Sequence, residues 1–163
     1  MTDISSNDTF IDPRDVTSCA DEFRSEIEDK QEQIDAVEEQ LTDAKVELED
    51  ELQDEDPETD DIEASIAAFE AQKSEFEDEL AELEDDAQKI FELESDCSDY
   101  ARGESLINED YWVTYAQQLA EDVDGIDVSN WPFTCIDWEQ AADVLAMDYT
   151  TITFECQDFY VRS

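Results

Sequence analysis

A strict three-four spacing of apolar residues across residues 21–96 constrains this chain more than any other feature of its sequence. Such spacing places side chains on the a and d seam of a coiled coil. It occurs in two runs, separated by the polar segment QDEDPETDD, and a lysine fills one seam position in each run. The first run is Phe23, Ile27, Lys30, Ile34, Val37, Leu41, Ala44 and Leu48, and the second is Ile62, Ile66, Phe69, Lys73, Phe76, Leu80, Leu83, Ala87 and Ile90.

The polar segment predicts how the two runs are connected. Pro57 has no backbone N–H and disfavours helix in the residue before it, so the first helix should end near Leu52. The second should begin near Asp60 or Asp61. We therefore predict a long antiparallel coiled-coil hairpin over residues 15–97, with its turn at about 53–60 and Asp15 or Thr17 as the first cap. A second chain can also fill such a seam, so a homodimer stays open as an alternative.

The charge of the chain limits its partners. It has 51 acidic and 8 basic residues, for a net charge of −43. Intrinsic disorder is the usual reading of such a charge, but 40% of the residues are hydrophobic and they are periodic. We expect adaptation to a salt-rich cytoplasm to be at least part of the cause of the acidity, because molar salt shortens the screening length to about 3 Å. The sign disfavours direct binding to nucleic acid or anionic membranes and predicts a basic protein partner.

The charge of the hairpin resembles that of duplex DNA in its linear density. Residues 21–96 hold 33 acidic and five basic residues. Helices of this length extend about 52 Å at about 1.5 Å per residue, which gives one carboxylate per roughly 1.6 Å of rod, whereas duplex DNA has one phosphate per about 1.7 Å. We therefore expect outward-facing carboxylates to mimic phosphates, and the candidates are Glu28, Asp35, Glu38, Glu39, Asp43, Glu49, Glu75, Asp78, Glu82 and Asp85.

The four cysteines give a second set of candidates. None forms a CxxC pair and the chain has no His, so a structural zinc site is not expected. Reduced, buried thiols are the default in a cytosol. However, Cys19 and Cys97 lie at similar distances from Pro57, so the hairpin should bring them together as a disulfide candidate. Cys135–Cys156 is a second, weaker pairing.

The chain outside the hairpin divides into two parts. Residues 1–14 are polar and aperiodic, which predicts a flexible tail. Residues 98–163 hold all three Trp and all five Tyr, and they predict a compact α+β domain with a turn at Gly103, two helices and a terminal β-hairpin. Asn108 and Asp137 should cap the helices, and Gly125 should end the first of them. The inward-facing set should include Trp112, Tyr115, Ala116, Leu119, Val123, Trp138, Ala141, Ala142, Leu145 and Met147, with Trp131 also in the core.

Residues 106–162 contain a Tyr-Ala helix, an Ile-Asp-aromatic helix start, an Asp-Tyr step and a closing strand. The positions are Tyr115, Ala116, Ile136, Asp137, Trp138, Asp148, Tyr149 and Tyr160. In these positions the C-terminal sequence resembles small phage and prophage proteins and the last domain of the ArdA antirestriction family. The resemblance implies a virus or mobile-element protein. Members of that family are elongated acidic proteins that occupy the DNA-binding groove of type I restriction enzymes. In this chain a helical hairpin stands where the family has its earlier acidic domains.

Several classes of chemistry have no support in the sequence. Without His there is no Ser-His or Cys-His nucleophile, and two Gly cannot build a phosphate-binding loop. The acidic turn lacks the spacing of a calcium loop, so neither metal nor cofactor is expected. We expect a non-enzymatic binding protein that mimics DNA and blocks a host defence or restriction enzyme. The alternative is an assembly coiled coil of a halophilic virus. Either protein would be found in the cytoplasm of a halophilic host or in a virion, since no apolar run is long enough for a membrane span.

Overall fold

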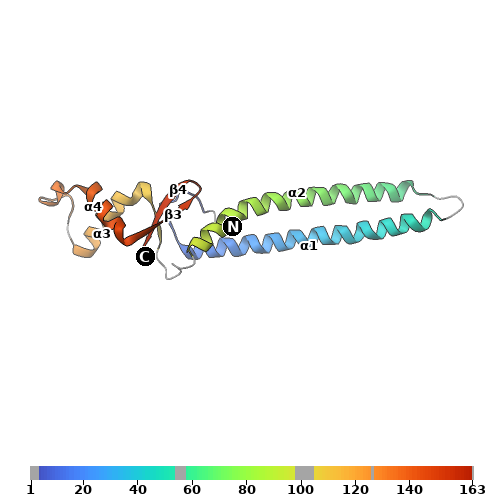
Figure 1. The fold of residues 1–163 in the computed structure, drawn as a ribbon, viewed down its shortest axis with the longest axis horizontal. Helices are drawn as coiled ribbons and strands as arrows, with labels where there is room; N and C mark the ends of the chain where they lie inside the picture. The colour runs from blue at the N-terminus through green and yellow to red at the C-terminus, as the bar shows by residue number, and fades with distance from the viewer. Residues whose placement is uncertain (1–3, 54–57, 98–104, 126, 163) are drawn as a thin grey trace. The chain divides into compact units, whose positions relative to one another are not determined.

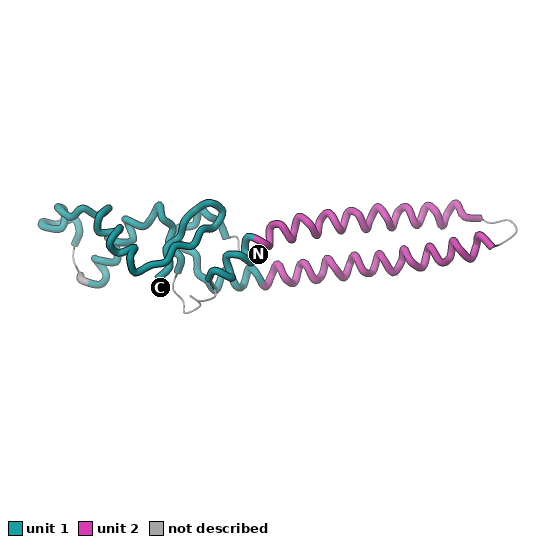
Figure 2. The backbone as a smooth tube through the Cα atoms, in the orientation of Figure 1, with its two compact units in different colours: residues 1–20, 89–163 teal, residues 21–88 magenta. Residues whose placement is uncertain are grey.

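The computed structural model describes residues 4–53, 58–97, 105–125 and 127–162. The chain forms two compact units (Figure 2). One, the hairpin unit, comprises residues 21–88. The other, the mixed unit, comprises residues 1–20 and 89–163. The predicted hairpin covers residues 15–97 and the predicted second domain begins at residue 98. In the structure, residues 15–20 and 89–97 of the predicted hairpin belong to the mixed unit.

Two long helices dominate the chain, as predicted (Figure 1). Helix α1 spans Pro13–Glu51 and helix α2 spans Asp60–Cys97. Neither contains an internal Gly or Pro. Both are rich in Glu, and α2 is also rich in Ala, and these residues favour helix. Acidic residues occupy the first turn of α2, where they complement the positive end of the helix dipole. The predicted turn at 53–60 lies partly outside the described residues, as do Pro57 and the predicted turn at Gly103.

The N-terminal segment is part of the mixed unit and is not the predicted flexible tail. Phe10–Ile11 form strand β1, and α1 begins directly after it at Pro13. Asp12, not Asp15 or Thr17, caps the helix, because its carboxylate accepts a hydrogen bond from the Arg14 backbone N–H at 2.9 Å. Pro13 suits the first helical position, where a backbone N–H has no helical partner. A two-residue strand among polar neighbours has too short a pattern to be predicted.

The mixed unit contains a four-stranded antiparallel sheet of order β1-β2-β4-β3. Strand β2 is Leu106–Asn108, β3 is Tyr149–Phe154 and β4 is Gln157–Arg162. The predicted terminal hairpin is therefore present as β3 and β4. Its turn is at Glu155 and Cys156, both with positive φ, one residue earlier than the predicted CQD turn. The segment YARGESLI, residues 100–107, reads as a connector in the sequence, but its described end, Leu106 and Ile107, belongs to strand β2. This strand joins β1 to the terminal β-hairpin, since it pairs with β1 on one side and with β4 on the other.

Asn108 holds these distant segments together. Its side chain is buried, and its Nδ2 donates to the backbone oxygens of Ser6 at 3.0 Å and Asp8 at 3.2 Å. Its Oδ1 accepts from the Asp110 backbone N–H and from Gln157 Nε2. The predicted capping role is confirmed, since Asn108 caps the 3₁₀ turn Glu109–Tyr111 that leads into helix α3, Trp112–Asp124. Burial of an amide is tolerated because all these bonds are made.

The two faces of the sheet have different partners. Cross-strand pairing places Phe10, Ile107, Tyr160 and Thr151 on one face. This face carries a core built with α3 and with helix α4, Trp138–Leu145. Trp112 is central to it: its Nε1 donates to the Ala142 carbonyl at 3.0 Å, and its ring packs on Tyr160 with centroids 4.4 Å apart. The opposite face carries a second buried set: Ile11, Leu106, Ile152, Phe159 and Val161.

The remaining predictions for this region are met in part. Asp137 caps α4 by accepting from the Gln140 N–H at 3.1 Å, and Gly125 ends α3 in the left-handed conformation, both as predicted. The predicted core set is too large. Trp131, Met147 and Val123 are 82%, 81% and 72% exposed. Val123 lies in the last turn of α3 and Met147 lies in the 3₁₀ turn that follows α4. At these ends the apolar face of the helix extends beyond the core, so it is not covered.

The cysteines are thiols in the structure, so the predicted Cys19–Cys97 disulfide and the weaker Cys135–Cys156 pairing are not observed. Cys19 and Cys97 are buried near the start of α1 and at the end of α2, within the mixed unit. Cys135 and Cys156 are exposed. Burial, followed by the charge of Asp96, raises the pKa of the Cys97 thiol to about 11.

These environments predict the reactivity of the thiols. At about pH 8 the disulfide reagent DTNB should react rapidly with Cys135 and Cys156 and slowly with the buried pair, because the thiolate is the reactive form. All four should react in denaturant. If only two thiols reacted in denaturant, the chain would contain a disulfide. Rapid reaction of all four thiols in the native chain would contradict the burial.

The raised pKa of Cys97 also predicts a loss of stability at high pH. Between about pH 9 and pH 11 the Cys97 thiol ionises in the unfolded chain but stays protonated in the folded chain. The free energy of unfolding of the mixed unit should therefore fall over this range.

Candidate functional site: the acidic surface of the hairpin

The apolar seam fixes which residues of the hairpin face outward. Ile34, Val37, Ala44 and Ala87 are buried, and the other predicted seam positions within residues 21–88 are buried or half-buried. Nearly every residue between them is exposed. The set of inward-facing residues is therefore the set that the spacing predicted, and the two helices pack along it. Coiled-coil supercoiling stays a prediction.

The three lysines of the hairpin unit form ion pairs between its helices. Lys30 Nζ lies 2.6 Å from Glu79, Lys45 Nζ lies 3.0 Å from Glu70, and Lys73 Nζ lies 2.7 Å from Glu38. Lys30 also lies 4.8 Å above the centroid of the Phe76 ring. A long aliphatic stem allows a lysine in a seam to pack while its ammonium group reaches the rim. These lysines align the helices, and of the ten outer carboxylate candidates they pair only with Glu38 among the described ion pairs.

Lys73 shows how strongly one of these cations is held. Its ammonium group lies 2.7 Å from Glu38 and 3.3 Å from Glu77. The hydrogen bonds to these two carboxylates raise the pKa of Lys73 above its ordinary value. Glu38, one of the ten phosphate-mimic candidates, is therefore already paired with a cation and is a weaker candidate than the others.

All ten candidate carboxylates are exposed, as a phosphate mimic requires. The four on α2 form one continuous row, because spacings of three and four residues bring side chains together on a helix surface. The row extends over about 15 Å at about 1.5 Å per residue. Its members are Glu75, Asp78, Glu82 and Asp85. The six on α1 are less regular: Asp35, Glu39 and Asp43 follow one another at four-residue spacing, whereas Glu28 and Glu49 have no candidate within four residues.

The acidic residues are unevenly distributed over the hairpin. Residues 75–86 of α2 include eight acidic residues, whereas residues 62–74 include only Glu63 and Glu70. The ion pair between Lys30 and Glu79 places the acidic part of α2 beside the first half of α1, which is also acidic. Within α2, negative charge is therefore concentrated in residues 75–86. The segment that connects the helices and its flanks are acidic as well, with nine acidic residues among residues 49–61. The alanines between Ala64 and Ala71 mark the part of α2 with little charge.

The hairpin carries charge that its own structure does not balance. Neither long helix has a basic residue in its last turn, where a cation would complement the dipole. Instead Glu49 and Asp50 lie near the end of α1. Exposed ion pairs such as Lys45–Glu70 contribute little to stability. Like-charge repulsion along both helices therefore opposes folding, and it weakens where salt screens it.

This repulsion predicts a dependence of the fold on salt. Lowering the salt from about 1 M to about 0.1 M lengthens screening from about 3 to about 10 Å, which exceeds the distance between neighbouring carboxylates. Helicity measured by circular dichroism should fall at the lower salt, and the melting temperature should fall with it. Identical spectra and melting temperatures at both salts would contradict this expectation.

Other kinds of site are absent from the described part of the chain. No group of three or more metal-ligating side chains occurs among residues 4–53, 58–97, 105–125 and 127–162. Within the same residues, no helix combines the length and apolar character that crossing a bilayer requires. Comparison with known proteins adds no further assignment: no family model, curated protein or solved structure matches this chain. The resemblance to the ArdA family therefore stays a prediction.

Proposed function

We propose that this chain is a non-enzymatic binding protein whose acidic hairpin mimics DNA and antagonises a basic, DNA-binding protein of its host. The observation that carries the proposal is the exposed row of carboxylates on α2. The row faces away from the seam, where Lys30 and Lys73 pair with carboxylates of the opposite helix. DNA-binding grooves contact phosphates chiefly through Lys and Arg. A rigid surface of closely spaced carboxylates offers them the same partners.

The proposed partner is a restriction or other defence enzyme, in the cytoplasm of a halophilic host. The carboxylate row of α2 refines the expected contact. Binding should be centred on residues 75–86 of α2 and on the acidic residues of α1 beside them, because the continuous row of exposed carboxylates lies there. An acidic coat without regular spacing would be enough for salt adaptation alone. The regular spacing of this row is therefore an argument for a binding role in addition to adaptation.

Capture from host lysate tests the proposal. The immobilised chain, in about 1 M salt to limit non-specific polyanion binding, should retain DNA-binding proteins. A duplex of roughly two helical turns should release them. Polyglutamate at the same charge concentration should release them less well, because it lacks a fixed geometry. Equal release by both polyanions, or retention of no DNA-binding protein, would contradict the mimic.

A specific observation favours assembly as the second candidate function. Many seam residues are only half-buried, including Ile27, Leu41, Phe69 and Leu80. A hollow of about 430 Å³ between the helices is bordered by Ala44, Ile62 and Phe69 and by five polar residues, Gln40, Asp43, Glu47, Asp61 and Ser65. A second hairpin, from another copy or from a virion protein, would cover the half-buried seam residues. Sedimentation in about 1 M salt distinguishes the two, since assembly predicts a concentration-dependent oligomer.

A further inference from the structure

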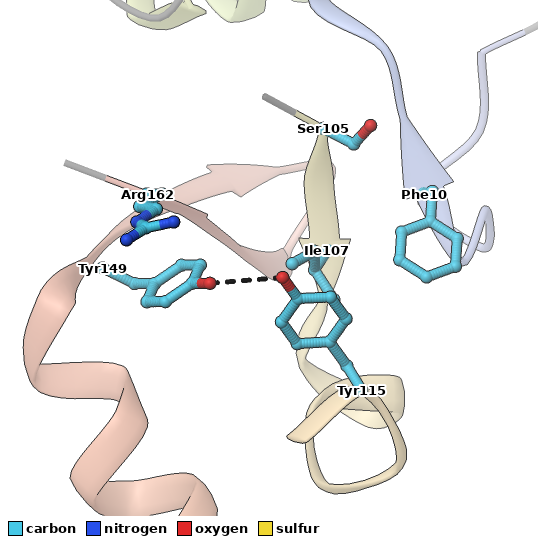
Figure 3. A pocket seen from close by; sticks show the side chains of 6 residues that line it. All are labelled: Phe10, Ser105, Ile107, Tyr115, Tyr149 and Arg162. Carbon is cyan, nitrogen blue, oxygen red and sulfur yellow. Dashed lines mark hydrogen bonds between the residues drawn. The ribbon is translucent and has the colours of Figure 1, made fainter. Parts of the chain in front are cut away.

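A pocket in the mixed unit lies apart from the acidic surface and has the opposite character. It has a volume of about 280 Å³ and lies on the sheet face that also carries α3 (Figure 3). Every strand contributes to it: β1 through Phe10, β2 through Ile107, β3 through Tyr149 and β4 through Arg162. The cross-strand pairs Phe10–Ile107 and Tyr149–Arg162 bring these side chains to the same face.

Arg162 gives this pocket its charge. Its side chain is exposed, and among the described residues it forms no ion pair. By contrast Arg14, Lys30, Lys45 and Lys73 each lie within 4 Å of a carboxylate. In a chain with 51 acidic and 8 basic residues, a guanidinium that forms no ion pair with any described carboxylate is unexpected. Even Asp148, which lines the neighbouring groove together with Arg162, forms no ion pair with it.

Hydroxyl groups and apolar walls complete the pocket. The Tyr115 and Tyr149 hydroxyls lie 3.2 Å apart, hydrogen-bonded to each other, and Ser105 adds a third hydroxyl at the rim (Figure 3). Phe10 is 45% exposed, and its ring packs edge-on against Tyr111 with centroids 5.3 Å apart. The pocket therefore combines one cation, several hydrogen-bonding hydroxyls and an aromatic wall, which is the composition of a small-molecule site.

We propose that this pocket binds the carboxylate of an organic acid with an aromatic or branched apolar body. The carboxylate would lie on the guanidinium of Arg162, which can hold it through two parallel hydrogen bonds. The apolar body would pack on Phe10 and Ile107. The pocket is large enough for an aromatic ring, because a cavity of about 150 Å³ already admits benzene. The acid is either a free small molecule or the terminal carboxylate of a peptide that ends in an apolar residue.

A matched pair of ligands tests this proposal on the full-length chain. Calorimetric titration in about 1 M salt, which screens the net negative charge, compares phenylacetate with the uncharged phenylacetamide. Phenylacetate should bind at least about tenfold more tightly, the preference expected when a charge-assisted bond is lost. Comparable affinities for the two, or no binding of phenylacetate at 10 mM, would overturn the proposal. A short peptide ending in phenylalanine, free or amidated, shows whether a chain end is accepted.

Variants then locate the site. Arg162→Gln should remove the preference for phenylacetate, whereas Arg24→Gln, in the hairpin unit, should keep it. Tyr149 and the rest of the pocket are retained in both, and near-ultraviolet circular dichroism of the Trp112 core verifies folding. If Arg162→Gln fails to fold, Arg162→Lys should keep part of the preference. An unchanged preference in a folded Arg162→Gln chain would refute the site. The proposed DNA mimicry does not depend on this result.

Discussion

Replacing Ile34 by aspartate should separate the two helices of the hairpin. Ile34 is 4% exposed and lies in the middle of the α1 seam. The substitution removes a buried apolar side chain and places a carboxylate in the seam, where the two seam lysines, Lys30 and Lys73, already pair with Glu79 and Glu38. It does so in a unit that already carries strong like-charge repulsion. We expect a loss of about 3–5 kcal/mol in the free energy of unfolding, measured by thermal circular dichroism in about 1 M salt.

Two further substitutions calibrate this result. Glu39→Gln alters an exposed residue on the outer face of the same helix and should leave the melting temperature unchanged or slightly raised. Leu41→Asp should have a smaller effect than Ile34→Asp, because Leu41 is half-buried. If Ile34→Asp melted like Glu39→Gln, the assignment of the inward-facing residues would be wrong.

The hairpin could be predicted from the sequence because the apolar period of each helix and the polar, Pro-containing segment between the helices are both local features. The apolar period of each helix is set by residues three and four apart, and it recurs over many turns, so single exceptions such as Lys30 and Lys73 do not obscure it. The same local logic predicted the capping roles of Asn108, Asp137 and Gly125. Each of these depends on one residue and the backbone next to it.

The mixed unit was less predictable because its sheet joins segments far apart in the chain. Strand β1 is two residues long, and it pairs with β2 almost a hundred residues later. No local pattern distinguishes such strands from a tail and a connector. The pocket at Arg162 has the same origin, since its walls come from four strands and a helix. The exposure of Trp131 was also missed, because composition places aromatic residues in a core without showing which of them the core reaches.

Neutralising the outer carboxylates should abolish binding to the DNA-binding partner without unfolding the hairpin. The six-fold variant combines Asp35→Asn and Glu39→Gln on α1 with Glu75→Gln, Asp78→Asn, Glu82→Gln and Asp85→Asn on α2. All six positions are exposed, so no packing is lost, and relief of repulsion should keep or raise the melting temperature. Each phosphate-like contact contributes modestly, so one substitution should weaken binding slightly and six together by at least about 100-fold.

A second six-fold variant separates the position of the charge from its amount. It neutralises exposed carboxylates of the mixed unit and therefore changes the net charge equally. Its positions are Asp15, Asp110, Asp122, Glu139, Asp143 and Glu155. If the acidic surface of the hairpin is the binding site, this variant should retain most of the parent's affinity.

The most direct test is competition between these chains and duplex DNA for the DNA-binding protein recovered by capture, at one fixed high salt concentration. The account predicts that the parent and the mixed-unit variant displace the duplex at similar concentrations, while the hairpin variant fails to displace it. Equal displacement by all three chains, or equal loss in both six-fold variants, would contradict the claim that carboxylates on the hairpin take the place of phosphates.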